Sequence, residues 1–446
     1  MAVIAPFRGI RYVTARAGRL GELISPPYDS ISPAQQEQLL ARNPFNVTHI
    51  MLGREKPGDG PEENKYTRAA HLWREWLAEG YLRADATPAI YPAEQSFTAP
   101  DGRRLTRRGV IVACRLTEYR EGFVIPHEKS LGSFKADRLQ LLRHLKANLS
   151  PIFGFYQDER GEVPAVLAPS ALETVAEAIS DDGVHHRLWR VDDPDVVARV
   201  RDILAPKRVF IGDGHSRYEA ALAYRNEVVA ADPNLPADGA HQYALMFLCS
   251  SSDPGVVIYP THRVISGLPG LDLPKLLQEL GRWFTVDTLE EDVRRTAGRA
   301  WAVSKLGEHG GKSTAFLLVS AADQKARILT LRDDADLSLA SLPRSETLRA
   351  LDLELLHGVI FQHLLGLSPE AQGEEKNLSF VRDTGEAIQG ALSGRYQLAF
   401  VVNPTPMWQL QAVADAGETM PQKSTFFYPR LATGMVMKSI DPAERL

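Results

Sequence analysis

The 446-residue sequence lacks the features that define several classes of protein. It has two cysteines, Cys114 and Cys249, each inside an apolar run, so we expect buried thiols rather than a disulfide framework or a Cys-x-x-Cys metal or redox motif. No apolar stretch approaches the ~20 residues that span a bilayer, and the first residues lack the apolar core of a signal peptide. The sequence therefore predicts a soluble, cytoplasmic protein with no membrane partner.

The charge balance argues against another class of partner. The chain carries 51 basic and 56 acidic residues, a net charge of -5, and it has no basic tail or stripe. Nucleic-acid scaffolds usually present a basic patch, so we expect no nucleic-acid partner. The sequence contains no internal repeat or low-complexity stretch, and its length predicts two or three packed units. Nothing in it indicates the oligomeric state.

Short apolar runs alternate with helical patterns, which predicts an α/β fold with mixed sheets. A hairpin is expected where the strands 89–97 and 107–116 are joined through a Pro-Asp-Gly turn. Further strands are expected at 4–12, 47–52, 152–156, 208–212, 243–249, 256–259, 315–320, 326–331 and 397–402. Helices are expected at 32–43, 62–79, 136–147, 216–227, 275–284, 290–306 and 345–365.

The distribution of polar motifs suggests three parts. Residues 1–270 hold most of these motifs and are predicted to form a catalytic unit. Residues 271–394 hold few, and we interpret them as an additional α/β unit that supports the first or is inserted into it. Residues 395–446 contain a strand and a polar segment, and they are predicted to return to the active site.

The strongest local motif lies where a predicted strand meets a predicted helix. Gly212 and Gly214 flank Asp213 and allow the backbone to approach a ligand closely. The first amides of the helix are unpaired and favour an anion, while His215 and Arg217 add donors suited to phosphate. The alternative is an ordinary turn in which Asp213 caps the helix.

A second motif places Glu128 between His127 and Lys129. A carboxylate there could act as a general base if burial raises its pKa toward the operating pH. Lys129 is a candidate cofactor-binding residue. The basic helix that follows could hold phosphate, or it could simply be a solvated face.

Two further polar clusters supply the remaining candidates. Lys423, Ser424 and Thr425 lie in a loop between prolines, where they could form a cradle for an oxyanion or a phosphate. His262 and Arg263 follow an apolar strand and are candidates for substrate contact. A structural network inside the protein explains such a pair equally well.

One glycine-rich segment looks like a phosphate-binding Walker loop but does not fit the pattern. Residues 307–314 read Gly-Glu-His-Gly-Gly-Lys-Ser-Thr, and Leu306 stands where the first glycine belongs. The segment also precedes a predicted strand, whereas a phosphate-binding loop follows a strand and opens a helix. We interpret it as an exposed turn.

Over nearly its whole length the chain resembles the bacterial domain-of-unknown-function family 1015. The segments that carry this resemblance are Ala5-Pro6-Phe7, Ser25-Pro26-Pro27-Tyr28-Asp29, Pro126-His127-Glu128-Lys129, Ala147-Asn148-Leu149-Ser150-Pro151, Asp213-Gly214-His215, Pro260-Thr261-His262-Arg263 and Lys423-Ser424-Thr425. The family name implies no activity.

Three of these segments also resemble, in the same order, motifs of the archaeal free serine kinases, which have a ParB/sulfiredoxin-like nucleotide fold. The resemblance implies that Glu128 deprotonates the acceptor hydroxyl and that Gly214, His215 and Arg217 bind nucleotide phosphates. It implies further that Asp213 is a cap or a magnesium ligand. Lys423, Ser424 and Thr425 would contact substrate or phosphate.

We therefore predict a small-molecule kinase that uses ATP or ADP with Mg²⁺, its leading acceptor being free L-serine. The predicted catalytic residues are Glu128, His215 and Asp213. The predicted cofactor-binding residues are Gly212, Gly214, His215, Arg217 and Lys129. The predicted substrate-binding residues are Lys423, Ser424, Thr425, His262 and Arg263, whereas Asp29 stays unassigned. The alternative is a non-catalytic nucleotide-binding or ParB-like module, and a sulfiredoxin-like repair enzyme is disfavoured because Gly214 stands where its thiol belongs.

Overall fold

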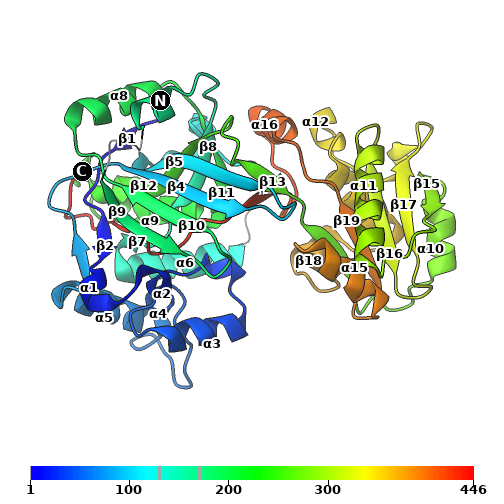
Figure 1. Cartoon of the computed structure of the whole chain (residues 1–446), viewed down its shortest axis with the longest axis horizontal. Helices are drawn as coiled ribbons and strands as arrows, with labels where there is room; N and C mark the ends of the chain where they lie inside the picture. Colours follow the sequence, from blue (N-terminus) through cyan, green and yellow to red (C-terminus); the bar gives the residue numbers. More distant parts are fainter. Residues whose placement is uncertain (1, 129–131, 169–172) are drawn as a thin grey trace. The chain divides into compact units, whose positions relative to one another are not determined.

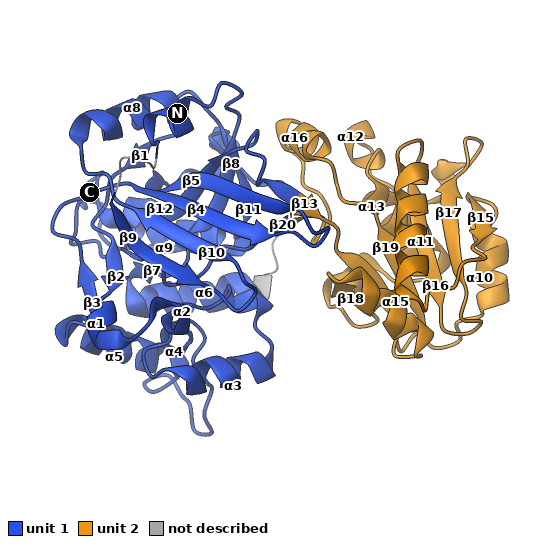
Figure 2. Cartoon of the chain, in the orientation of Figure 1, with its two compact units in different colours: residues 1–126, 130–257, 427–446 blue, residues 127–129, 258–426 orange. Residues whose placement is uncertain are grey.

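The computed structural model describes residues 2–128, 132–168 and 173–446. Its chain forms two compact units, which Figure 2 shows in different colours. Unit 1 contains Met1–Pro126, Ser130–Val257 and Phe427–Leu446, and unit 2 contains His127–Lys129 and Ile258–Phe426.

These units differ from the three parts expected from the sequence. Residues 262–265 already pair within the sheet of unit 2, so this unit begins before the expected boundary at residue 270. Residues 398–402, expected in a separate C-terminal part, belong to the same sheet, and only 427–446 rejoins unit 1. The division of catalytic and supporting roles among these parts stays a prediction.

Unit 1 is built on a nine-stranded mixed sheet (Figure 1). Its strands are β1 (Ile4–Ala5), β4 (Tyr91–Thr98), β5 (Arg104–Arg115), β6 (Val124–Ile125), β8 (Ile152–Tyr156), β9 (Thr174–Ile179), β10 (His185–Trp189), β11 (Val209–Asp213) and β12 (Tyr243–Ser250). They follow the order β6-β11-β8-β12-β5-β4-β10-β9, and β1 pairs with β5. The pairs β6–β11 and β8–β12 are parallel and the others antiparallel, which confirms the predicted α/β class with mixed sheets.

Helices α8 (Pro194–Leu204) and α9 (His215–Ala231) pack against one face of this sheet. Alternate residues of β5, including Val110, Val112 and Cys114, contribute to that core. Both cysteines are buried and unpaired, as expected, and burial raises the pKa of Cys114 to about 12. The predicted hairpin is also confirmed, since β4 and β5 pair antiparallel in a register that begins at Thr98 opposite Arg104.

The smaller elements of unit 1 surround this sheet. They are β2 (Ile10–Tyr12), α1 (Thr14–Ala17), α2 (Leu20–Leu23), η1 (Tyr28–Ser30), α3 (Pro33–Arg42), α4 (Thr48–Met51), α5 (Lys65–Ala78), β3 (Leu82–Ala84), η2 (Tyr119–Glu121), α6 (Gly132–Leu145), β7 (Ala147–Asn148), α7 (Glu162–Val166), η4 (Ala240–Gln242) and β21 (Lys438–Ser439). Strands β13 (Val257–Tyr259) and β20 (Phe426–Tyr428) lie where the chain passes from one unit to the other.

Unit 2 contains a six-stranded antiparallel sheet with the order β15-β17-β16-β19-β14-β18. Its strands are β14 (His262–Ile265), β15 (Phe284–Thr288), β16 (Ala315–Ser320), β17 (Ala326–Leu331), β18 (Leu378–Val381) and β19 (Leu398–Val402). Its helical elements are α10 (Leu273–Leu280), α11 (Thr296–Gly310), η5 (Leu337–Leu339), α12 (Glu346–Arg349), α13 (Asp352–Leu355), η6 (Leu356–Leu364), α14 (Pro369–Gly373), α15 (Thr384–Leu392) and α16 (Met407–Asp415).

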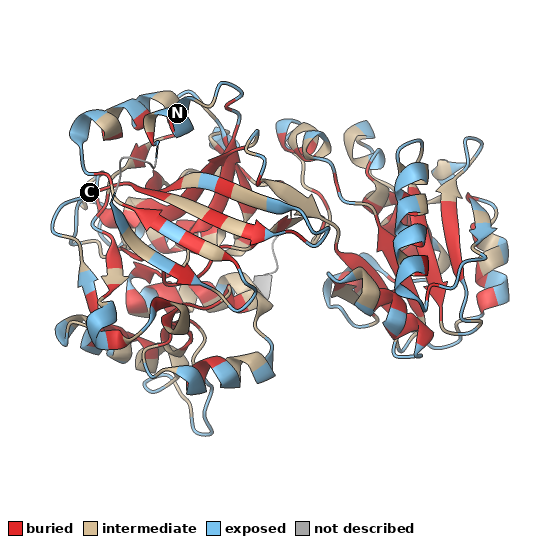
Figure 3. Ribbon diagram, viewed as in Figure 1, coloured by how far each residue is buried: buried red, intermediate tan, exposed pale blue. Residues whose placement is uncertain are grey.

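Helices cover both faces of the unit 2 sheet. Leu317 and Val319 of β16 share a core with α11 and α15, whereas Phe316 and Leu318 share one with α10, α13 and η6. Because successive side chains of a strand point to opposite faces, every residue of β16 is buried (Figure 3). The glycine-rich segment 307–314 lies at the end of α11 and precedes β16, which supports the interpretation that it is not a phosphate-binding loop.

Three expected elements differ in the structure. Residues 47–52, expected as a strand, contain the short helix α4, because the side chain of Asn46 accepts from the backbone N–H of Thr48 at 2.9 Å and turns the chain. The single helix expected at 345–365 is divided into α12, α13 and the π-helix η6. The first expected strand, 4–12, is interrupted and gives β1 and β2. Among the described helices, none is both long and apolar enough to cross a membrane.

Candidate active site

In unit 1, the turn after β11 carries Asp213 and opens α9. The pairing of β11 with β8 shifts by one residue between Ile211 and Asp213, which places Asp213 at an irregular end of the strand. Gly214 then adopts a φ of 98°, a conformation that an L side chain rarely tolerates. The N-cap residue Gly214 has no side chain to cap α9, and the N-terminus of a helix favours an anion.

Two guanidinium groups hold the carboxylate of Asp213. Arg217 Nη2 donates to Oδ2 at 2.9 Å, and Arg430 Nη2 donates to Oδ1 at 2.8 Å and to Oδ2 at 3.0 Å. Burial by itself would raise the pKa of Asp213, but Arg430 and Arg217 outweigh it and hold this pKa well below its usual range. Asp213 is therefore a permanently charged anchor for two arginines.

Arg430 also joins this turn to the Pro-Pro-Tyr-Asp loop. Its Nη1 forms an ion pair with Asp29 Oδ1 at 2.8 Å, and both side chains are largely buried. Burial opposes ionisation of Asp29, but Arg430 keeps the pKa of this carboxyl below its usual value. The sequence left Asp29 unassigned and did not single out Arg430, which lies 217 residues from Asp213 along the chain.

The geometry does not fit the predicted role of Asp213 as a magnesium ligand. Both of its carboxylate oxygens already accept from arginine, and a dication would face the charges of Arg217 and Arg430. Among the residues that the structure describes, there is no group of three His, Cys, Asp or Glu side chains able to hold a metal ion. The use of Mg²⁺ stays a prediction.

The two glycines of this motif have different surroundings. A Cβ on Gly212 would come within 2.6 Å of the Phe153 ring, so packing in the core explains this glycine, which was predicted to bind the cofactor. A Cβ on Gly214 would come within 2.8 Å of the Arg217 guanidinium, which lies directly over the turn. His215 is the first residue of α9 and is buried. Lys129, another predicted cofactor ligand, lies outside the described residues.

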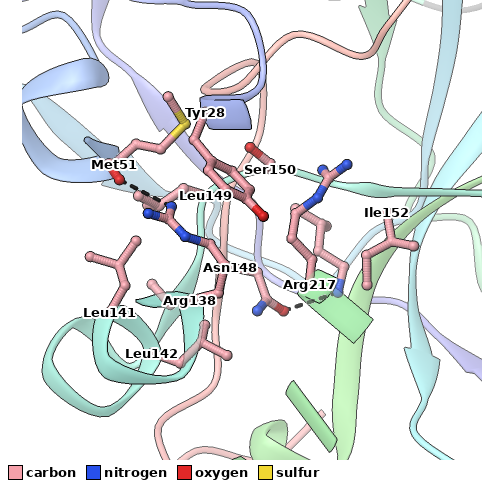
Figure 4. Close-up of a pocket in the computed structure, with 12 residues that line it drawn as sticks. Tyr28, Met51, Arg138, Leu141, Leu142, Asn148, Leu149, Ser150, Ile152 and Arg217 are labelled. Atoms are coloured by element: carbon pink, nitrogen blue, oxygen red, sulfur yellow. Dashed lines mark hydrogen bonds between the residues drawn. The ribbon is translucent and has the colours of Figure 1, made fainter. Parts of the chain in front are cut away.

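A cavity in unit 1 shares Arg217 with this turn. Its empty volume is about 470 Å³, and its walls include Tyr28, Leu142, Ile152 and Arg138 (Figure 4). The Arg138 guanidinium lies 3.9 Å from the centre of the Tyr28 ring, and its Nη1 donates to Met51 O at 3.0 Å. The cavity thus combines apolar walls and an aromatic ring with the guanidinium of Arg217 from the turn at Gly214, a combination that suits a nucleotide.

In unit 2, Glu128 lies against the loop that contains Lys423, Ser424 and Thr425. The backbone N–H of Ser424 donates to Glu128 Oε2 at 3.2 Å, and Thr425 Oγ1 lies 3.5 Å from the same oxygen. His127 is fully buried, and its Nε2 lies 2.7 Å from Thr425 Oγ1. The backbone N–H of Met420 donates to His127 O at 2.8 Å, which fixes the segment 127–128 beside the loop.

Burial raises the pKa of Glu128 above its ordinary value. The charge of Lys423 and the amides of Lys423, Ser424 and Thr425 stabilise the carboxylate, but they do not cancel the effect of burial. A buried carboxylate whose pKa stays raised while donors surround it is a candidate general base.

A buried arginine holds the backbone of this loop. Lys423 has a φ of 57°, an unusual conformation for a residue other than glycine. Arg263 Nη2 donates to Lys423 O at 3.1 Å and to Gln422 O at 3.4 Å, while Thr405 Oγ1 donates to Ser424 O at 3.1 Å. The amides of the loop therefore face Glu128, while its carbonyls are bound from the other side.

The π-helix η6 supplies a partner for Arg263. Arg263 Nε donates to His357 Nε2 at 3.3 Å, so His357 carries its proton on Nδ1, which donates to Gln372 Oε1 at 2.6 Å. Burial and the charge of Arg263 lower the pKa of His357 to about 3, which keeps its ring neutral. Sequence reasoning missed His357, because no motif in the sequence marks it. In the structure it lies in the π-helix η6, and π-helices are frequent at functional sites.

His262 and Arg263, predicted to contact substrate, are both buried and engaged within unit 2. His262 Nε2 lies 2.8 Å from Thr384 Oγ1, and its Nδ1 accepts from the backbone N–H of Val402 at 3.3 Å. Burial lowers the pKa of His262 to about 4, so it is a neutral residue of the core. Arg263 donates to the loop backbone, so these contacts match the structural network given as the alternative, and a substrate contact by either residue stays a prediction.

Comparison with known proteins identifies a family but no activity. The sequence model of the family described as "Protein of unknown function (DUF1015)" matches residues 4–354. No curated protein matches the chain.

Solved structures with a related arrangement include kinases. The free serine kinase in complex with AMP is 13% identical, with 73% of this chain and 91% of that chain covered and a TM-score of 0.36. A variant of that kinase in complex with ADP is 12% identical, with coverages of 73% and 92% and the same TM-score. A conserved hypothetical protein from Pyrococcus furiosus is 14% identical, with coverages of 72% and 93% and a TM-score of 0.33. TM-scores this low support no inference about activity.

Proposed function

Since the chain belongs to the DUF1015 family, whose description assigns no activity, we propose from its own residues that it is a nucleotide-dependent phosphotransferase. The proposed acceptor is a hydroxyl of a small metabolite, with free L-serine as the first candidate. The observation that carries the proposal is Glu128, a buried carboxylate with a raised pKa, clamped by the backbone of Lys423, Ser424 and Thr425.

The turn of unit 1 supports the nucleotide side of this proposal. Arg217 and the N-terminus of α9 favour phosphate groups, and Asp213 holds Arg217 in place. The cavity that includes Tyr28 and Arg217 lies next to that turn, and its aromatic and apolar walls favour a base or a ribose. ATP and ADP are both candidates for the donor, and the solved free serine kinases contain AMP or ADP.

In the proposed reaction, the ionised Glu128 accepts the proton of the acceptor hydroxyl as the oxygen attacks the terminal phosphorus of the nucleotide. A new P–O bond forms, the bond to the leaving phosphate oxygen breaks, and ATP becomes ADP, or ADP becomes AMP. Such a reaction requires alignment, a base and positive charge around the phosphoryl group more than covalent chemistry. Any Mg²⁺ would supply positive charge at the phosphates; the carboxylate of Asp213 does not fit as its ligand.

The direct test is a phosphorylation assay with the full chain, followed by phosphorus NMR. The protein is incubated with Mg²⁺ and ATP or ADP, and with L-serine, other hydroxyl-bearing amino acids or small alcohols. We expect a new phosphoester with the wild type that is absent with Glu128→Gln. Nucleotide binding without product for any acceptor would favour a non-catalytic nucleotide-binding module.

A further inference from the structure

A second cavity, entirely within unit 2, lies against the same loop that clamps Glu128. Its empty volume is about 290 Å³. Its walls are formed by Leu351, Asp352, Leu353, Asn403, Pro404, Thr405, Pro406, Gln409, Met420 and Ser424. This volume includes solvent at the open mouth of the cavity, so only a molecule of a few heavy atoms can fit.

The cavity offers negative charge and hydrogen-bond acceptors. Of the described residues that line it, none is Lys, Arg or His, and Asp352 is the one charged side chain. The amide nitrogens of Asn403 and Gln409 donate to Leu306 O and Ala350 O, respectively. The side-chain oxygens of these two residues can therefore accept hydrogen bonds from a ligand. The lining is therefore complementary to a cation that donates several hydrogen bonds.

Asp352 has no cationic partner of its own. Thr314 Oγ1 donates to its Oδ1 at 2.8 Å, and no ion pair to Asp352 occurs among the described residues. Burial raises the pKa of this carboxyl to about 6, because no nearby positive charge offsets its loss of solvation. A bound cation would provide the missing compensation.

Three residues connect this cavity to the loop that clamps the proposed base. Ser424 lines the cavity, and its backbone N–H donates to Glu128 Oε2 at 3.2 Å. Met420 also lines the cavity, and it forms an isolated parallel β-bridge with Glu128. Thr405, a third lining residue, donates to Ser424 O at 3.1 Å. The same loop therefore forms part of the cavity wall and binds the Glu128 carboxylate.

We propose that this cavity binds the phosphoryl acceptor through a primary ammonium group that pairs with Asp352. The inference rests on the proposed function and narrows its substrate class to compounds that carry both an ammonium and a hydroxyl group. Free serine and simple amino alcohols belong to this class, whereas hydroxy acids without nitrogen do not. A carboxylate on the acceptor is not required, because the lining supplies no cation to pair with it.

The test is isothermal titration calorimetry of the full chain with three probes and no nucleotide: L-serine, 2-aminoethanol and 3-hydroxypropionate. We expect the two amines to bind and the hydroxy acid not to bind. Asp352→Asn should weaken amine binding at least about tenfold, since one partner of a buried charge pair is lost. Equal binding of 3-hydroxypropionate and 2-aminoethanol would overturn the proposal, as would unchanged amine affinity in Asp352→Asn.

Two further variants guard against a trivial loss of folding. Gln409→Leu removes a lining acceptor and should weaken amine binding a few-fold, while Asp287→Asn, on the exposed surface of the same unit, should leave it unchanged. Thermal unfolding of each variant shows whether it folds. If the wild type binds amines but forms no phosphoester, the phosphotransferase proposal fails and the cavity assignment stands. If acceptors with and without nitrogen are phosphorylated equally, the cavity assignment fails alone.

Discussion

Asp213 in unit 1 and Glu128 in unit 2 are both buried carboxylates, yet their surroundings shift their pKa values in opposite directions. Asp213 is held by the guanidinium groups of Arg217 and Arg430, so its pKa falls despite burial. Glu128 is held by the charge of Lys423 and by backbone amides of the loop, which do not offset burial, so its pKa rises. Two hydrogen-bonded guanidinium groups outweigh desolvation at Asp213, whereas one ammonium charge and neutral donors only reduce it at Glu128.

This contrast separates two chemical roles. A carboxylate with a lowered pKa stays ionised and is a poor proton acceptor, but it can fix arginines that bind phosphate. A carboxylate with a raised pKa is a better base, provided that it is ionised at the working pH. Each of the following variants changes the surroundings of either Asp213 or Glu128.

The largest effect on stability is expected from Arg430→Met. It would leave Asp213 and Asp29 buried with one guanidinium fewer, so the free energy of unfolding should fall by about 3–5 kcal/mol. Urea denaturation measures this change. Arg445→Met, which breaks an exposed ion pair with Asp238, is the matched control and should cost under about 1 kcal/mol. Equal losses in the two variants would show that Asp213 does not depend on Arg430.

The next largest effect is expected from Arg217→Met on nucleotide binding. Arg217 lies over the turn at Gly214 and lines the unit 1 cavity, so the affinity for ATP and ADP should fall about 10–100-fold. Calorimetric titration measures it. Arg201→Met, an exposed arginine of α8, is the control. Unchanged affinity in Arg217→Met would remove the turn from the nucleotide site.

The smallest effect is expected from Lys423→Met, which sharpens the contrast. Loss of the Lys423 charge disfavours the ionised form of Glu128 and raises its pKa further. Because turnover requires ionised Glu128, the acid limb of the pH–rate profile should move to higher pH. The exposed Lys275→Met is the control. A shift to lower pH, or none, would contradict the assignment of this limb to Glu128.

The sequence predicted the local motifs better than their partners. The strand, the turn and the helix around Asp213 follow from apolar periodicity and glycine, which are local properties. Arg430 could not be found in this way, because its ion pairs to Asp213 and Asp29 depend on how distant segments fold together. The same holds for Asp352, which no motif distinguishes and whose cavity is formed by the three separate segments 351–353, 403–409 and 420–424.

Two differences between the expectations from the sequence and the structure have specific physical causes. Residues 47–52 have the apolar and β-branched composition of a strand, but the Asn46 side chain gives the backbone a local partner and a helical turn forms. For His262 and Arg263 the sequence left a substrate contact and a structural network equally open, and the structure buries both. A polar pair after an apolar strand can lie in a core or in a site, and only the tertiary partners distinguish the two cases.

The most direct test of the central claim, that Glu128 is the base, is single-turnover phosphoryl transfer to L-serine, or to whichever acceptor the screen identifies. We predict that Glu128→Gln slows the chemical step about 10²–10⁴-fold while nucleotide affinity is unchanged. Glu290→Gln, at an exposed position of unit 2, should match the wild type. A single-turnover rate in Glu128→Gln equal to that of the wild type would contradict the claim.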